Sequence, residues 1–114
     1  MEQGTKITTK SIQNVGILEL AGDVTSQAEA DITDGIRKLE QEGVKKFLFK
    51  FNEATYINSS GLAIIISLVS EGKKKKQTFA ASGMSKHFQK VFDVIGLTDY
   101  VHVYATENDA LKKL

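Results

Sequence analysis

The sequence of 114 residues contains no cysteine and no proline. Without cysteine the chain has no disulfide, no thiol nucleophile and no thiolate metal site, and without proline it has no rigid linker. The longest unbroken apolar run, residues 62–66, is far too short to span a bilayer, and residues 1–6 lack the apolar core of a secretion signal. These absences predict a cytoplasmic protein that does not enter a membrane.

Charge of one sign is also scarce, since 15 lysines and arginines oppose 14 aspartates and glutamates for a formal net charge of +1. This balance gives no overall field that would attract nucleic acid, so any charge effect must be local. Residues 73–76 are a run of four lysines, which is either a polyanion site or a solvated turn whose cations complement the end of a helix. The second interpretation is favoured, because no aromatic residues or further basic clusters accompany the run.

What is present is an alternation of strand and helix patterns, in a chain long enough for one core and hence for a single domain over residues 1–114. A turn signal at residues 13–16 predicts an opening hairpin. Ser26 and Glu29 form a capping-box pattern at the start of a helix that Gly43 ends. The predicted strands are residues 5–12, 15–21, 44–51, 78–82 and 100–104. The later helices are predicted at 60–71, ended by Gly72, around 88–95, ended by Gly96, and after the cap Thr106.

The resulting order, ββαβαβαβα, predicts an α/β fold. Strands separated by helices imply right-handed crossovers and a mixed, mostly parallel sheet of about five strands with about four helices. The aromatic and β-branched segment 44–51 is expected to be a buried, parallel central strand. Residues 60–71 are apolar around much more than one stripe, so this helix is expected to pack on more than one side.

Small polar residues stand where the strand at 44–51 leads into the helix at 60–71. Asn58 or Ser59 can cap that helix by accepting a backbone N–H that would otherwise be unpaired. The amides and partial positive charge of a helix start favour an anion, so a phosphate on Ser59 would be stabilised there. Because sites in such sheets form outside the carboxyl ends of the strands, residues 22–25 are expected beside residues 58–61.

The sequence offers no catalytic constellation. His87 and His102 have no acidic partner at a telling spacing and are interpreted as ordinary histidines. Histidines and carboxylates are not grouped at metal-ligand spacing, and the Gly-x-Ser-x-Gly, phosphate-loop and dinucleotide-binding patterns are missing. The chain is therefore predicted to be neither an enzyme nor the holder of a metal or cofactor.

Three segments, in order, resemble the motifs of the STAS domain family, to which the bacterial anti-sigma factor antagonists belong. Residues 20–25, Leu-Ala-Gly-Asp-Val-Thr, resemble the motif Leu-x-Gly-x-(Leu/Ile/Val)-Asp. Residues 56–62, Tyr-Ile-Asn-Ser-Ser-Gly-Leu, resemble the core Asp-Ser-(Ser/Thr)-Gly-Leu. Residues 91–97, Val-Phe-Asp-Val-Ile-Gly-Leu, resemble (Leu/Ile)-Phe-x-x-(Ser/Thr/Ile)-Gly-Leu. The resemblance runs nearly end to end.

The resemblance implies a partner switch. Members of the family bind an anti-sigma factor that is also a serine kinase of the GHKL ATPase type, and this binding releases the sigma factor. The kinase phosphorylates the first serine of the core motif, here Ser59, which breaks the complex, and a PP2C-type phosphatase restores it. By this resemblance the chain is a binder and a substrate, and the residues expected to bind the partner or to neighbour the phosphorylated serine are Asp23, Thr25, Asn58, Ser60 and Gly61.

Two positions depart from the family's pattern. Asn58 stands where the family usually has Asp directly before the phosphorylated serine, and Thr25 replaces the Asp of the first motif. Both changes remove a negative charge near Ser59. They indicate either a different kinase or a chain that binds without being phosphorylated, such as an accessory subunit that docks on a transporter ATPase. A third alternative is a sensor that binds a small ligand or nucleotide at the positive helix start.

Overall fold

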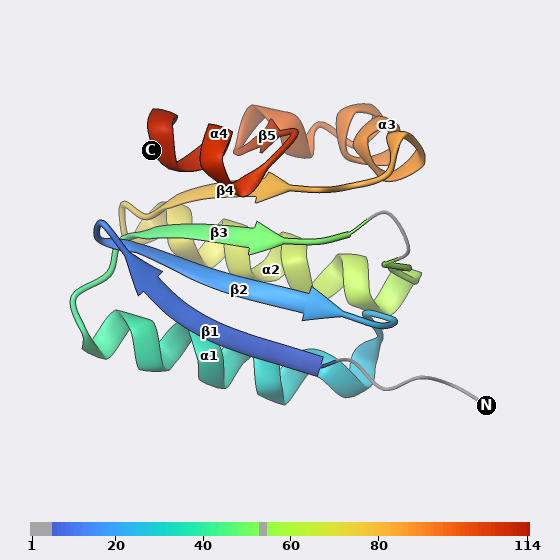
Figure 1. The fold of residues 1–114 in the computed structure, drawn as a ribbon. Helices are drawn as coiled ribbons and strands as arrows, with labels where there is room; N and C mark the ends of the chain where they lie inside the picture. Colours follow the sequence, from blue (N-terminus) through green and yellow to red (C-terminus); the bar gives the residue numbers. More distant parts are fainter. Residues whose placement is uncertain (1–5, 53–54) are drawn as a thin grey trace.

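The computed structural model describes residues 6–52 and 55–114, which form one five-stranded sheet in the order β1-β2-β3-β4-β5 (Figure 1). The strands are β1 (Lys6–Ile12), β2 (Val15–Ala21), β3 (Lys46–Lys50), β4 (Thr78–Ser82) and β5 (Val101–Tyr104). The α-helices are α1 (Glu29–Gln41), α2 (Ser59–Lys74), α3 (Lys86–Val94) and α4 (Glu107–Lys113), with 3-10 helices η1 (Ser26–Ala28) and η2 (Leu97–Asp99). The predicted element order and α/β class are confirmed.

The opening hairpin supplies the antiparallel pair of the sheet. β1 pairs with β2 in antiparallel register, with Ile12 opposite Val15, whereas β2–β3, β3–β4 and β4–β5 are parallel. The two loop residues, Gln13 and Asn14, both have positive φ, at 54° and 67°. A two-residue loop with positive φ at both positions matches the right-handed twist of paired strands, so this turn fixes the hairpin register. Thr5, the expected first residue of β1, lies outside the described residues.

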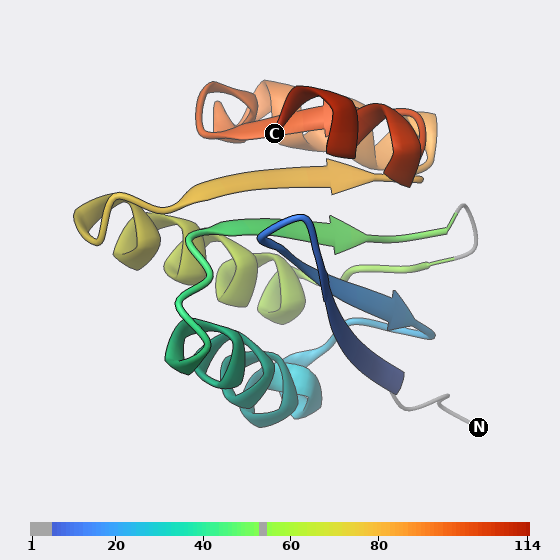
Figure 2. The ribbon, with the colours of Figure 1, turned by 60° about the vertical axis from the view of Figure 1, so that its left-hand side comes forward.

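The order of the strands decides which face each helix covers. Each parallel connection steps to the next strand in the same direction, so right-handed crossovers bring α1, α2 and α3 to one face. Figures 1 and 2 show α1 and α2 together on one side of the sheet and α4 on the other. Phe92 of α3 belongs to the same core as α1 and α2, whereas Ala110 of α4 packs in a separate cluster with Leu48 of β3.

The larger core is built around stacked phenylalanines of the central strands. The Phe47 and Phe79 rings lie 5.5 Å apart between centroids, and Phe49 and Phe79 lie 5.9 Å apart. All three side chains are buried, and each such ring contributes about 1.5–3 kcal/mol relative to an exposed one. β3 is thus the predicted buried, parallel central strand, although its ladder covers only Lys46–Lys50.

Several helix boundaries differ from the predictions. The Ser26 and Glu29 capping box is wrong: Ser26–Ala28 form the 3-10 turn η1, which Thr25 caps by accepting from the Gln27 amide at 3.3 Å. The prediction that α2 ends at Gly72 is also wrong, since the helix continues to Lys74. Gly72 lies inside α2, where a β-carbon would stand 2.2 Å from the Phe79 ring, so close packing of helix on strand requires glycine there.

Two smaller differences concern α2 and β5. α2 packs against both the sheet and α1, as expected of a helix that is apolar around more than one stripe. However, Ile66 of α2 is 42% exposed, so not all of its apolar residues are buried. β5 begins at Val101, one residue later than predicted, because residues 97–99 form η2. The other predicted ends hold: Gly43 follows α1 with φ 86°, Gly96 follows the end of α3 with φ 79°, and Thr106 caps α4 by accepting from Asp109 N at 3.1 Å.

Candidate functional site

The N-terminus of α2 is capped by a side chain, and that side chain is Asn58. Its Oδ1 accepts a hydrogen bond from the Gly61 amide at 2.8 Å, and its extended backbone, with φ −85° and ψ 177°, is that of an N-cap residue. Of the two residues that could cap the helix, Asn58 therefore does so. Ser59 and Ser60 occupy the first turn, both exposed, where the unpaired amides of a helix start lie. The Ser59 hydroxyl is accessible and is not used as the cap.

A short backbone bridge joins this helix start to the loop after β2. The Val24 amide donates to the Tyr56 carbonyl at 2.7 Å, and the Asn58 amide donates to the Val24 carbonyl at 3.1 Å. Val24 and Ile57 thereby form an isolated parallel bridge beyond the ends of β2 and β3. The two loops that carry the predicted site residues are neighbours, as expected, and Asp23 and Thr25 flank the bridge at Val24.

Gly61 permits this close approach. A β-carbon at this position would lie 2.1 Å from the Val24 carbonyl oxygen and 2.7 Å from its carbonyl carbon. Because both of these atoms belong to the backbone, no side-chain rotation could relieve the clash. Gly61 is therefore a packing requirement of the site, and a larger residue would push the start of α2 away from the Val24 loop.

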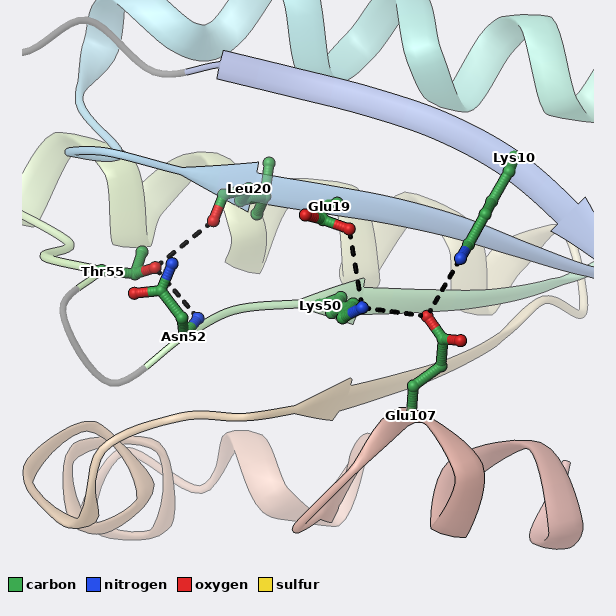
Figure 3. Close-up of polar contacts among 7 residues, drawn as sticks. All are labelled: Lys10, Glu19, Leu20, Lys50, Asn52, Thr55 and Glu107. Carbon is green, nitrogen blue, oxygen red and sulfur yellow. Dashed lines mark hydrogen bonds and ion pairs between the residues drawn. The ribbon is translucent and has the colours of Figure 1, made fainter.

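Thr55 anchors the segment that leads to the helix, and the sequence analysis missed it. Its side chain is only 4% exposed; its Oγ1 donates to the Leu20 carbonyl at 3.3 Å and accepts from the Asn52 amide at 3.1 Å (Figure 3). These bonds tie the β3–α2 connection to the end of β2, next to the Val24 bridge. A lone threonine in a loop gives no sequence signal for such a contact. A buried hydroxyl that bonds backbone on two sides holds a loop in one conformation.

A group of ion pairs lies on the face of the sheet that α4 covers, and it links α4 to the strands (Figure 3). Lys50 of β3 approaches Glu107 of α4 at 3.4 Å and Glu19 of β2 at 3.6 Å, and Lys10 of β1 reaches Glu107 at 3.4 Å. Burial by itself would lower the pKa of Lys50, but the attraction of Glu107 and then of Glu19 outweighs it, and the pKa is raised. The cluster holds two cations and two carboxylates, so its charges balance.

A shallow hollow of about 330 Å³ lies between α1 and α2 beside Ser60. Its lining includes Ser26, Thr33 and Ser67, and among the described residues that line it Glu29 alone is charged. A carboxylate with no cation beside it disfavours the phosphates of a nucleotide. Within the described residues there is also no group of three or more histidines or carboxylates arranged to hold a metal ion.

His87 and His102 do not take part in this site. His87 lies in the first turn of α3, exposed, with its ring 5.0 Å from that of Phe88. His102 lies in β5 and is also exposed. Within residues 6–52 and 55–114, no helix is long and apolar enough to cross a membrane.

The sequence matches a known protein family over nearly its whole length. Residues 6–110 match the profile of the STAS domain. The chain belongs to the STAS domain family. The match covers the Val24 loop, the α2 start and all five strands, so the site described above lies within the STAS domain itself.

Solved STAS structures share this architecture. The anti-sigma factor antagonist SpoIIAA in its unphosphorylated form is 19% identical, with a TM-score of 0.75 over 95% of both chains. An anti-sigma factor antagonist from Mycobacterium paratuberculosis is 14% identical, with a TM-score of 0.78 over 99% of this chain and 97% of the other. The Bacillus cell fate determinant SpoIIAA in its phosphorylated form is 19% identical, with a TM-score of 0.70 over 95% of this chain and 98% of the other. At these identities the likeness is one of fold.

Proposed function

We propose that this STAS domain is an anti-sigma factor antagonist that binds a serine-kinase anti-sigma factor of the GHKL ATPase type and is switched off by phosphorylation of Ser59. One observation carries the proposal. Ser59 is exposed in the first turn of α2, while Asn58 supplies the cap, so the serine hydroxyl can be modified without removing a contact that the fold needs. A PP2C-type phosphatase would restore the binding form.

Electrostatics separates the effect of the phosphate on the fold from its effect on binding. A phosphoserine adds about −1.5 to −2 charges at pH 7, and an anion at a helix N-terminus gains roughly 0.3–1 kcal/mol. Phosphorylation of Ser59 should therefore leave the domain folded. In a closed interface the same charge must lose its water at a cost of several kcal/mol, and about 1.4 kcal/mol already weakens binding tenfold. The interface is lost while the fold is retained.

The first experiment is an intact-mass measurement on the protein from its native cells, followed by peptide mapping across Asn58, Ser59 and Ser60. A phosphate on Ser59 supports the switch. A protein that is reproducibly unmodified, with and without stress, contradicts it.

Binding assays with the purified kinase then compare Ser59→Ala, Ser59→Asp and Ser67→Asp. Ser59→Ala should stay bound and Ser59→Asp should bind at least about tenfold more weakly. Ser67→Asp is the matched control, because it adds the same charge at an exposed serine of α2 about two turns along, on the side that faces the α1 hollow, and it should leave the affinity nearly unchanged. Equal affinity of Ser59→Ala and Ser59→Asp, with folding intact, would exclude the switch.

A second candidate is an accessory subunit that docks on a transporter ATPase and is never phosphorylated. It is favoured by the neutral side chains of Thr25 and Asn58, both of which serve as helix caps and add no negative charge near Ser59. A pull-down separates the two functions by partner class, a transporter ATPase or a kinase. The nucleotide sensor has less support, since the described residues that line the hollow beside Ser60 include Glu29 and no cation.

A further inference from the structure

A second surface of this domain combines exposed apolar side chains with one uncompensated cation. A groove of about 300 Å³ runs between the C-terminal half of α2 and the segment from α3 to η2, lined by Ile66, Val69, Lys73, Ile95, Leu97 and Tyr100. Three of the large apolar side chains that are exposed among the described residues line it: Ile66 at 42%, Ile95 at 46% and Tyr100 at 49%. Exposed apolar side chains gathered in one place are typical of an interaction site.

Lys73 supplies the charge of this groove. Its Nζ lies 4.5 Å from the centroid of the Tyr100 ring, and it makes no ion pair with any carboxylate of the described residues. The next two lysines of the run are paired, Lys74 with Glu71 at 3.5 Å and Lys75 with Glu40 at 3.1 Å. Lys73 and Asp99 both line an adjoining hollow together with Tyr100, and no ion pair joins them. All four lysines of the run are exposed, and Lys73 and Lys74 lie in the last turn of α2, as the solvated interpretation predicts. Lys73 in addition lines the apolar groove.

The groove is continuous with the proposed switch along one face of α2. Ser59, Ile66 and Lys73 are spaced by seven residues, which is close to two helical turns, so all three lie on one stripe of the helix. The half-buried Leu62 lies between the first two. At 1.5 Å per residue the stripe is about 20 Å long. A standard protein interface buries about 800 Å² per partner, which is wide enough to cover both ends of such a stripe.

We propose that this groove is a second docking element for the kinase anti-sigma factor, and that it takes an apolar segment of that protein carrying a carboxylate which pairs with Lys73. The inference rests on the proposed function for the identity of the partner. The unpaired cation beside an apolar surface selects a segment of complementary charge. A phosphate on Ser59 would lie about 10 Å from Ile66 along the helix. We therefore expect the groove to raise the affinity for the kinase by the same factor whether or not Ser59 is phosphorylated.

The test measures the affinity of the purified GHKL-type kinase for the full-length chain without magnesium, so that no phosphate is transferred. Lys73→Glu and Ile95→Ser should each weaken binding at least about tenfold. Lys45→Glu is the control for charge, as an exposed lysine of the same sign away from the groove, and Val94→Ser is the control for apolar surface, as a 74% exposed neighbour that does not line it. Both controls should change affinity less than about threefold.

The outcomes separate the groove from the switch. Weakening by the groove variants but not by Ser59→Asp supports the groove and excludes the switch. If only Ser59→Asp weakens binding, or if the groove variants weaken it no more than their controls, the groove is not a docking element. The proposed Ser59 switch is not contradicted by either result. Absence of kinase binding by the wild-type chain overturns both. Sedimentation of the chain alone gives a further check, since a dimer that Ile95→Ser dissociates would assign the groove to a second copy and overturn its assignment to the kinase.

Discussion

A β-carbon on Gly61 would lie 2.1 Å from the carbonyl oxygen of Val24, so the start of α2 and the loop after β2 approach as closely as backbone allows. The same Val24 carbonyl accepts the Asn58 amide at 3.1 Å. The contact holds two segments that are distant in sequence at a fixed separation. It places Ser59 one residue away from a rigid junction.

Gly61→Ala should destabilise the domain by about 3 kcal/mol, the upper range for overpacking, because the added carbon meets backbone on its nearest side. Urea unfolding measures the change. Ser60→Ala is the control in the same turn and should alter stability by less than about 0.5 kcal/mol. A Gly61→Ala protein as stable as the wild type would show that the Val24 loop can move away from the added carbon at little cost in free energy.

Asn58→Ala should cost about 1 kcal/mol of stability, because the Gly61 amide loses the acceptor that now lies 2.8 Å away. Asn58→Asp should keep the cap, since a carboxylate oxygen accepts the same bond. Ser59→Ala should leave stability nearly unchanged. Thermal unfolding of the three variants checks this order, and a loss for Ser59→Ala equal to that of Asn58→Ala would contradict the assignment of the cap.

Phosphorylated Ser59 should leave the unfolding free energy unchanged or raise it by up to about 1 kcal/mol, because the added charge lies at the positive end of α2. Thermal melts of the modified and unmodified proteins, at low and high salt, measure the difference. Salt should reduce any gain by screening. A marked destabilisation on phosphorylation would mean that the switch acts by unfolding the site.

Thr55→Val should cost roughly 1–3 kcal/mol, because it removes the hydroxyl that bonds the Leu20 carbonyl and the Asn52 amide in a buried loop. Thr55→Ser keeps the hydroxyl and should lose much less. Hydrogen exchange of the Asn52 amide reports the loop directly. Equal stability of the valine and serine variants would show that the two bonds contribute little.

Glu40 should make a pH-dependent contribution to stability. Burial by itself raises its pKa, but hydrogen bonds from Gln77 and Lys75 outweigh burial and lower it below 4.5. A lowered pKa in the folded state means that the stabilisation is full above pH 4.5 and is lost as the pH falls through the folded pKa. Glu40→Gln should therefore cost up to about 1 kcal/mol at pH 7 and much less in acid.

Unfolding of the wild type and Glu40→Gln across this pH range gives the measurement. Repeating it after Lys75→Ala and Gln77→Ala removes the partners at 3.1 Å and 2.6 Å, and the difference between pH values should shrink. If the unfolding free energies of the wild type and Glu40→Gln differ by the same amount at every pH, the charge of Glu40 does not stabilise the fold.

Element order and class could be predicted because they depend on local patterns. The turn at Gln13 and Asn14, the glycines after α1 and α3, and the Thr106 cap all act within a few residues, and all lie where the sequence predicted them. The capping box failed for a tertiary reason: the chain must first bridge Val24 to Ile57, and the 3-10 turn η1 follows that bridge. The prediction that Gly72 ends α2 failed for a similar reason, since this glycine lies within α2 where the helix packs closely against the Phe79 ring.

The sequence by itself determined the order of the elements along the chain, the mostly parallel pairing and the polar helix start at Asn58, because periodicity, turn chemistry and crossover handedness are local or general constraints. Only the tertiary structure decided that Asn58 caps α2 while Ser59 stays exposed, that Thr55 anchors the loop, and that Lys73 lies over Tyr100 beside an apolar groove. Each of these depends on distances between segments far apart in the chain. Such distances are set by packing against a shared core and have no counterpart in local sequence.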